Sequence, residues 1–406
     1  MTDLELLDRI QRKVLWLATW MVHHANALRP GSDGIKVGGH QASSASVVSL
    51  LTALYFKALR PGDIVAVKAH AAPAFYAIQY LRGRLAGAAL RELRGFGGLQ
   101  AYPSRRKNPD IVDLSTGSMG LGAVQATFGA LATQYLTDRV GTARPERFIV
   151  LVGDAELDEG TVWEALAEEA VGRLGNLVWI VDVNRQSLDR IVPDVRRHQL
   201  PQLFATLGWR VHELRYGRRL EALLEQPGGA ALRQRLDAMP YPEYQSLLRL
   251  PPAAIRKSLV RRGPAGADPA IETLLANIRD ERLAELVVDL GGHDLGLITE
   301  ALAAIEAERE RPSVLLALTI KGWGLPFAGD LLNHTALLTS AQIEELRAGL
   351  GILAGEEWAG FADDSPEAAW IRGLPKLYRP SAPPGPAPSL PWELGECRPR
   401  RPLGGC

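Results

Sequence analysis

The chain has 406 residues, 47% of them hydrophobic, and its 46 basic residues balance 46 acidic ones. Such a chain can bury a large core, and its even charge gives no sign of a nucleic-acid or membrane-surface partner. No run reaches the roughly 18 consecutive apolar residues of a membrane-spanning helix, and no signal peptide opens the sequence, so we expect a cytoplasmic protein. The only cysteines, Cys397 and Cys406, argue against a disulfide framework or a cysteine metal site.

Apolar periodicity divides most of the chain into helices and short strands. Helical spacing occurs at about residues 2–28, 41–58, 118–138 and 161–171. Two apolar runs, Phe148–Val152 and Leu177–Val183, fit strands that are buried on both faces of a parallel sheet. We therefore predict a doubly wound α/β domain whose mostly parallel sheet carries helices on both faces.

The predicted domain covers residues 1–355 and includes a helical insert at about residues 201–286. Within that insert, Trp209–Leu214 carries a weak strand signal. Residues 356–406 are predicted to be a linker and a Pro-rich tail, because the segment LYRPSAPPGPAPSLP is crowded with Pro, Gly and Ser. This composition favours extended, disordered chain over packed structure.

An acidic turn follows the first of the two strands, and an asparagine follows the second. The turn contains Asp154, and Asn184 lies 30 positions further along the chain. Strand, helix and strand make a βαβ unit, in which ligands bind outside the carboxyl ends of the strands. Asp154, Asn184 and the main-chain carbonyl of Gln186 can therefore converge on one Mg²⁺ or Ca²⁺ ion. Such ions take oxygen ligands and often share them with phosphates.

The same residues also fit an ordinary turn, an ordinary strand end and the acidic first turn of a helix. The bare pattern leaves both interpretations open. Four further segments, in chain order, decide between them. They are KVGGHQASSAS (36–46), AVKAHAAPAFYAIQYL (66–81), LSTGSMGLG (114–122) and ALTIKGWG (317–324).

Together with the acidic turn, these segments resemble the thiamine diphosphate (ThDP) enzymes of the transketolase class. They are most similar to the homodimeric type of the decarboxylating component of the pyruvate dehydrogenase complex, over about residues 10–350. The resemblance implies the diphosphate-binding domain of these enzymes, with ThDP and Mg²⁺ (or Ca²⁺) as cofactors. It also implies a dehydrogenase that decarboxylates a 2-oxo acid, with pyruvate as the expected substrate.

The resemblance assigns roles to individual residues. The implied metal ligands are Asp154, Asn184 and Gln186. The implied cofactor contacts are Ser118, Met119, Gly120, Gly153, Asp154, Ala155 and Glu156. The implied active-site histidines, which steady or protonate substrate-derived intermediates, are His40, His70 and His334.

Two positions depart from the family pattern. Ala155 stands where the related enzymes have the second glycine of a GDG turn, and glycine is favoured where a backbone approaches a phosphate closely. Ser104 stands where the pyruvate enzymes have a histidine, and a hydroxyl cannot act as a cation or a general acid near neutral pH. The cofactor is therefore better specified by the sequence than the substrate is.

The related enzymes build their active site from two halves. Their pyrimidine-binding domain supplies the glutamate that activates the cofactor, and the matched region corresponds to the diphosphate-binding half alone. We therefore expect a separate subunit to bring the other half, in a homodimer or a heterotetramer. The alternatives are transketolase-type transfer of a ketol unit between sugar phosphates, and a truncated relic without catalytic activity.

Overall fold

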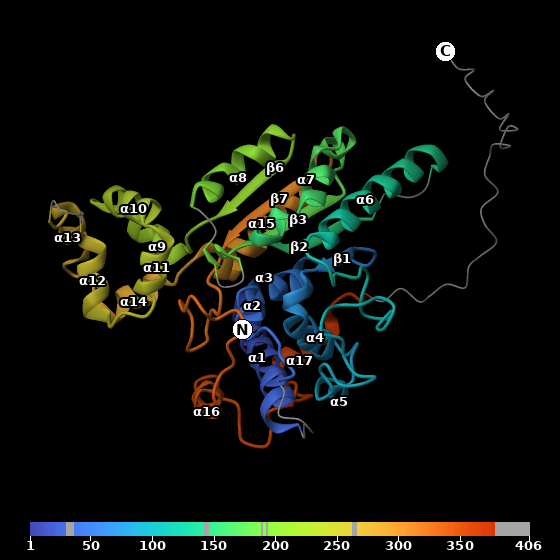
Figure 1. Cartoon of the computed structure of the whole chain (residues 1–406), viewed down its shortest axis with the longest axis horizontal. Coiled ribbons are helices and arrows are strands. Elements are labelled where there is room, and N and C mark those ends of the chain that lie inside the picture. The colour runs from blue at the N-terminus through green and yellow to red at the C-terminus, as the bar shows by residue number, and fades with distance from the viewer. Residues whose placement is uncertain (30–35, 142–145, 188–189, 192–193, 262–265, 378–406) are drawn as a thin grey trace, which may run out of the picture.

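A five-stranded parallel sheet forms the centre of the molecule (Figure 1). The computed structural model describes residues 1–29, 36–141, 146–187, 190–191, 194–261 and 266–377. The sheet order is β1 (Ile64–Val67), β2 (Phe148–Gly153), β3 (Leu177–Val183), β7 (Ser313–Leu318) and β6 (Arg210–Leu214). Each neighbouring pair is parallel, so the predicted fold class is confirmed.

Successive residues of the central strands face two separate cores, as the two-residue period of a strand requires. One core contains Ile149 and Ile180 together with α1 (Asp3–His23), α2 (Gln41–Ala45), α3 (Val48–Ala53), α4 (Ala72–Leu81) and α15 (Leu295–Ala307). The other contains Val150 and Trp179 together with α6 (Leu121–Val140), α7 (Gly160–Ala167) and α8 (Asp194–Thr206). Figure 1 shows α6 to α8 on one side of the strands and α1 to α4 on the other.

The helix boundaries follow local sequence signals. Helix α1 begins with a capping box between Thr2 and Glu5 and continues into a π-helical turn, η1 (His24–Leu28). Helix α6 begins three residues later than predicted, because Gly120 precedes it in the left-handed conformation with φ of 74°. The other two predicted helices are interrupted. The one at residues 41–58 consists of α2, α3 and the π-helical turn η2 (Leu54–Ala58), and the one at residues 161–171 consists of α7 and the 3₁₀ turn η5 (Glu169–Arg173).

The predicted insert contains more of the sheet than expected. The weak strand signal at Trp209–Leu214 is confirmed, since β6 pairs in parallel with β7 and forms one edge of the sheet. The helical part follows β6 and lies beside the sheet (Figure 1). It consists of α9 (Arg218–Leu224), α10 (Gly229–Ala238), α11 (Tyr241–Leu247), α12 (Pro252–Val260), α13 (Pro269–Leu275) and α14 (Asp280–Val287).

Several short elements connect these layers. They are η3 (Ala69–Ala71), α5 (Gly87–Leu90), η4 (Asp154–Asp158), the small hairpin of β4 (Gln186–Ser187) and β5 (Arg190–Ile191), and η7 (Gly291–His293).

The segment that follows the sheet is folded further than the sequence predicted. Helices α16 (Ser340–Gly349) and α17 (Pro366–Gly373) both contact α1. Arg9 forms an ion pair with the buried Glu367 at 2.9 Å. The linker expected from residue 356 onward is therefore packed structure as far as residue 377. The predicted Pro-rich tail, residues 378–406, lies outside the described residues.

Candidate functional site

A pocket of about 360 Å³ lies at the carboxyl ends of the strands. Most of the predicted site residues line it, namely His40, His70, Met119, Gly153, Asp154, Ala155, Glu156, Asn184, Gln186 and His334. Ser118 and Gly120 are not among the lining residues, and neither is Ser104. Segments separated by almost 300 residues thus meet at the edge of the sheet where the βαβ argument placed a ligand site.

The acidic turn links the ends of two neighbouring strands. Asp154 directly follows β2, and its carboxylate accepts hydrogen bonds from the main-chain N–H groups of Ala155 (2.9 Å) and Arg185 (2.6 Å). Glu156 accepts from the N–H of Gly153 (3.0 Å) and from that of Gly120 (2.9 Å). The glycine turn before α6 is therefore fixed directly to the acidic turn, although Gly120 itself does not line the pocket.

The loop after β3 directs further oxygen atoms to the same place. Asn184 Oδ1 accepts a hydrogen bond from the N–H of Gln186 at 3.0 Å, and Asn184 Nδ2 donates to Asp182 at 2.8 Å. The side-chain Oε1 of Gln186 is buried and has no hydrogen-bond partner among the described residues. A carboxylate, an amide oxygen and an unsatisfied oxygen at one pocket form a donor set that suits Mg²⁺ or Ca²⁺.

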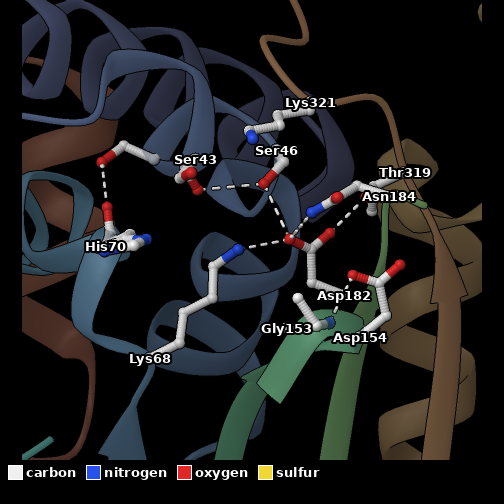
Figure 2. Close-up of polar contacts among 12 residues, drawn as sticks. Ser43, Ser46, Lys68, His70, Gly153, Asp154, Asp182, Asn184, Thr319 and Lys321 are labelled. Atoms are coloured by element: carbon white, nitrogen blue, oxygen red, sulfur yellow. Dashed lines mark hydrogen bonds and ion pairs between the residues drawn. The ribbon is translucent and has the colours of Figure 1, made fainter. Parts of the chain in front are cut away.

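A buried aspartate that the sequence analysis missed organises this loop. Asp182 is fully buried and accepts hydrogen bonds from Ser46 (2.9 Å), Asn184 and Thr319, and it forms an ion pair with Lys68 at 2.5 Å (Figure 2). Burial raises the pKa of Asp182, but the Lys68 charge and these hydrogen bonds outweigh burial and hold the pKa below its usual value. The available signal was one acid inside the otherwise apolar run LVWIVDV.

The three predicted histidines gather on the opposite wall of the pocket. The ring centroids of His40 and His70 are 3.9 Å apart, and those of His40 and His334 are 4.7 Å apart. His40 Nδ1 lies 3.1 Å from the carbonyl oxygen of His334, and His334 Nδ1 lies 3.2 Å from the ammonium of Lys321. Burial lowers the pKa of His40, and burial together with the two neighbouring histidines lowers that of His70 further. In this surrounding the neutral form of both rings is favoured.

A further histidine, His293, is buried outside the pocket. It stacks on Trp323 with 4.7 Å between ring centroids, and its Nε2 accepts a hydrogen bond from the N–H of Ile320 at 2.9 Å. Burial lowers its pKa to about 3. These contacts support the strand end from which the loop carrying His334 departs.

The helical insert holds the loop after β3 through Arg185. This residue lies between Asn184 and Gln186, is buried, and has a φ of 60°, a conformation that costs a non-glycine residue about 1–2 kcal/mol. Its guanidinium lies 4.2 Å from the ring centroid of Tyr241 and 5.1 Å from that of Tyr244, both on α11. The conformation directs the Arg185 N–H to Asp154, so the cation–π contacts stabilise the position of the carboxylate.

A substitution in α11 is therefore expected to affect the metal site. We expect Tyr241→Leu to lower the free energy of unfolding by about 2–3 kcal/mol and to weaken Mg²⁺ binding, because the ring that holds Arg185 is lost. Tyr241→Phe keeps that ring and should bind Mg²⁺ nearly as the unchanged chain does. The matched control is Tyr55→Leu, a buried tyrosine in the other core, which should lose stability without changing Mg²⁺ binding in calorimetric titrations. Equal Mg²⁺ affinity in both leucine variants would contradict the link.

The pH dependence of the free energy of unfolding should reflect the titration of the buried carboxyl group of Asp154. Burial, and then the charge of Asp182, raise the pKa of Asp154 from its ordinary value of 3.8 to about 7. The folded chain then binds more protons at this group than the unfolded chain between about pH 4 and pH 7, so its contribution to stability falls as the pH rises through that range. Mg²⁺ needs the ionised carboxylate, so Mg²⁺ affinity should rise across the same range.

Denaturant unfolding of the metal-free chain at pH 4.5, 6 and 7.5 measures this effect. Asp154→Asn, which cannot titrate, should flatten that part of the profile. An unchanged profile would show that other groups control it.

The fold and this site define a class of protein: a doubly wound α/β domain with a polar pocket at the carboxyl edge of a parallel sheet, where such folds bind their ligands. Residues 62–231 match the family described as the thiamine diphosphate binding domain of transketolase. The predicted resemblance to the ThDP enzymes of the transketolase class is thus confirmed, and this chain carries their ThDP-binding domain.

Curated relatives extend the similarity beyond residues 62–231. The chain is 30% identical over 362 residues to the pyruvate dehydrogenase E1 component of Corynebacterium glutamicum, and 31% identical to that of Mycobacterium tuberculosis. Each alignment covers 85% of this chain, but only 38% and 37% of the respective relatives. The chain therefore spans well under half the length of the curated relatives that it matches.

Solved structures support the fold independently. A transketolase from Leishmania mexicana matches 90% of this chain with a TM-score of 0.63 and 18% identity, and the match covers 44% of that structure. The transketolase of Campylobacter jejuni matches 91% of this chain with a TM-score of 0.62 and 17% identity, over 46% of its length. Within the described part of the chain, none of the helices is both long enough and apolar enough to span a bilayer.

Proposed function

We propose that this chain is the diphosphate-binding half of a ThDP- and Mg²⁺-dependent dehydrogenase that decarboxylates a 2-oxo acid, with pyruvate as its substrate. One observation carries the proposal: oxygen donors from Asp154 and Asn184 line the same pocket as the imidazoles of His40, His70 and His334. The first set suits a metal and a diphosphate, and the second suits proton transfer beside them.

We assign the following roles to the site residues. Asp154, Asn184 and Gln186 would hold Mg²⁺, and residues 118–120 would contact the cofactor before α6. When bound, ThDP supplies the electron sink that 2-oxo acid decarboxylation requires. The protein's own part is to orient the substrate, to exclude water and to move protons. The neutral rings of His40 and His70 suit the orienting role, since a neutral imidazole offers one hydrogen-bond donor and one acceptor.

The site requires a second half. The pyrimidine-binding half is proposed to come from a separate chain, in a cytoplasmic homodimer or heterotetramer. There are two alternative functions. Transketolase-type ketol transfer is favoured by the solved structures, which are transketolases. A non-catalytic relic is favoured by Ala155 and Ser104, which replace family residues.

Reconstitution tests the proposal. The purified chain is mixed with the candidate pyrimidine-domain partner, ThDP, Mg²⁺, pyruvate and an artificial electron acceptor, and both acceptor reduction and carbon dioxide release are followed. Turnover should require every component. A parallel reaction with sugar phosphates tests ketol transfer. Absence of acceptor reduction and of carbon dioxide release would contradict the pyruvate assignment, and absence of turnover on either substrate would favour the relic.

A further inference from the structure

A buried lysine lines the pocket without an assigned role. Lys68 directly follows β1 and is only 6% exposed. Its ammonium lies 2.5 Å from Asp182 Oδ2, and Asp182 is its one hydrogen-bonding side-chain partner among the residues that the structure describes. In Figure 2 the Lys68 side chain lies between His70 and Asp182, close to Gly153 and Asp154.

The ammonium has unused hydrogen-bonding capacity. A lysine carries three N–H donors, and the bond to Asp182 uses one of them. Leaving buried donors without partners is costly, and native structures seldom do so. The remaining donors adjoin the pocket that contains Asp154 and Asn184. An anionic oxygen atom in the pocket would satisfy them and would be strengthened by the positive charge.

A second buried ion pair, away from the pocket, provides a comparison for the pair of Lys68 and Asp182. Arg147 and Asp63 lie at the opposite, amino-terminal edge of the sheet, before β2 and β1. The guanidinium of Arg147 binds both carboxylate oxygens of Asp63 and also donates to the carbonyl of Ala58 at 3.0 Å. Neither Arg147 nor Asp63 lines the candidate site, whereas Lys68 does.

We propose that Lys68 is a ligand-binding residue that donates hydrogen bonds to an anionic oxygen group, either a phosphoryl oxygen of the cofactor's diphosphate or the carboxylate of the substrate. This inference deepens the proposed function and rests on it. The diphosphate is the better fit, because Lys68 lies over Gly153: its Cδ is 3.9 Å from where a Cβ of that glycine would stand. Gly153 and Asp154 belong to the turn assigned to the diphosphate and its metal.

The test must separate binding from folding. Lys68→Met alone would leave Asp182 buried without its cation, and Asp182→Asn alone leaves Lys68 without its carboxylate, so both single changes are destabilising. The informative comparison is therefore Asp182→Asn against the double variant Lys68→Met and Asp182→Asn, which differ only at Lys68. Arg147→Met combined with Asp63→Asn serves as the matched control, since it removes a buried ion pair far from the pocket. Denaturant unfolding confirms that each variant is folded.

Calorimetric titrations use inorganic diphosphate, with and without Mg²⁺, and separately pyruvate. We expect the double variant to bind diphosphate at least about tenfold more weakly than Asp182→Asn does, as the loss of a charged hydrogen bond implies. The Arg147 and Asp63 control should bind it as the unchanged chain does. A loss confined to pyruvate would assign Lys68 to the substrate carboxylate.

Two results would overturn the inference: equal affinities of the two Asp182 variants for both anions, or no binding of either anion by the unchanged chain. A different result would contradict the proposed function. Intact diphosphate binding without turnover in the reconstituted mixture would contradict the dehydrogenase and leave Lys68 as an anion ligand.

Discussion

Asp154→Asn should weaken Mg²⁺-dependent ThDP binding by at least about 100-fold while the chain stays folded. The carboxylate is the one charged group among the proposed metal ligands, and hard cations depend strongly on such ligands. The same substitution removes a buried charge that Asp182 repels, but it also removes the acceptor of one main-chain N–H, so the stability of the metal-free chain near pH 7 should change little. Calorimetric titration of Mg²⁺ and ThDP, together with denaturant unfolding, measures both quantities.

The matched control for this substitution is Asp289→Asn in the helical region. Asp289 is also buried and also accepts a main-chain hydrogen bond, from Leu220 at 2.9 Å, but it pairs with Arg219 away from the pocket. It should lower stability and leave ThDP binding unchanged. Retention of Mg²⁺-dependent binding by Asp154→Asn would remove this residue from the metal site.

Gly120→Ala should destabilise the chain by about 2–4 kcal/mol and disturb ThDP binding as well. Its φ of 74° costs an alanine about 1 kcal/mol. The added methyl would also stand 2.7 Å from Val162 Cγ2 and 3.1 Å from Glu159 Cβ, and such overpacking typically costs 1–3 kcal/mol. Because the Gly120 N–H binds Glu156, a shift of this turn moves the acidic turn too.

Helix α6 provides an internal control at its other end. Gly141 ends the helix with a similar φ of 66°, but among the described residues no atom outside its chain neighbours and its own helix lies within 4 Å of where its methyl would be. Gly141→Ala should therefore lose only the conformational part, about 1 kcal/mol, and keep ThDP binding. Equal losses in the two variants, measured by denaturant unfolding, would show that the contacts of Gly120 are unimportant.

Local sequence rules could predict the ends of the strands but not the contacts made across them. Asp154 and Asn184 could be placed because two apolar runs define adjacent parallel strands, whose carboxyl ends must lie at one edge. Lys68 and Asp182 could not, since they come from β1 and β3, which are separated by β2, and Lys68 reaches over Gly153 to make the contact. Such a contact depends on the sheet order, which the spacing along the chain does not encode.

Local sequence rules could not predict the contact between Arg185 and Tyr241, for a similar reason. The sequence predicted a helical insert but not its orientation. The contact between α11 and the loop after β3 depends on that orientation. A positive φ at an arginine is also contrary to local preference, so no turn rule would have selected it. The linker expected after residue 355 was wrong up to residue 377, because the short helix α17 gains its stability by packing on α1.

The position of β6 has a consequence for aggregation. Residues 201–286 were predicted as a helical insert with a weak strand signal, and they include the strand that covers the side of β7 facing away from β3. Without β6, the apolar strand Ser313–Leu318 would present a row of unpaired N–H and C=O groups to solvent, an arrangement that recruits strands from other molecules. The alternating Arg210 and Glu213 on β6 place exposed charges at this border and oppose such intermolecular pairing.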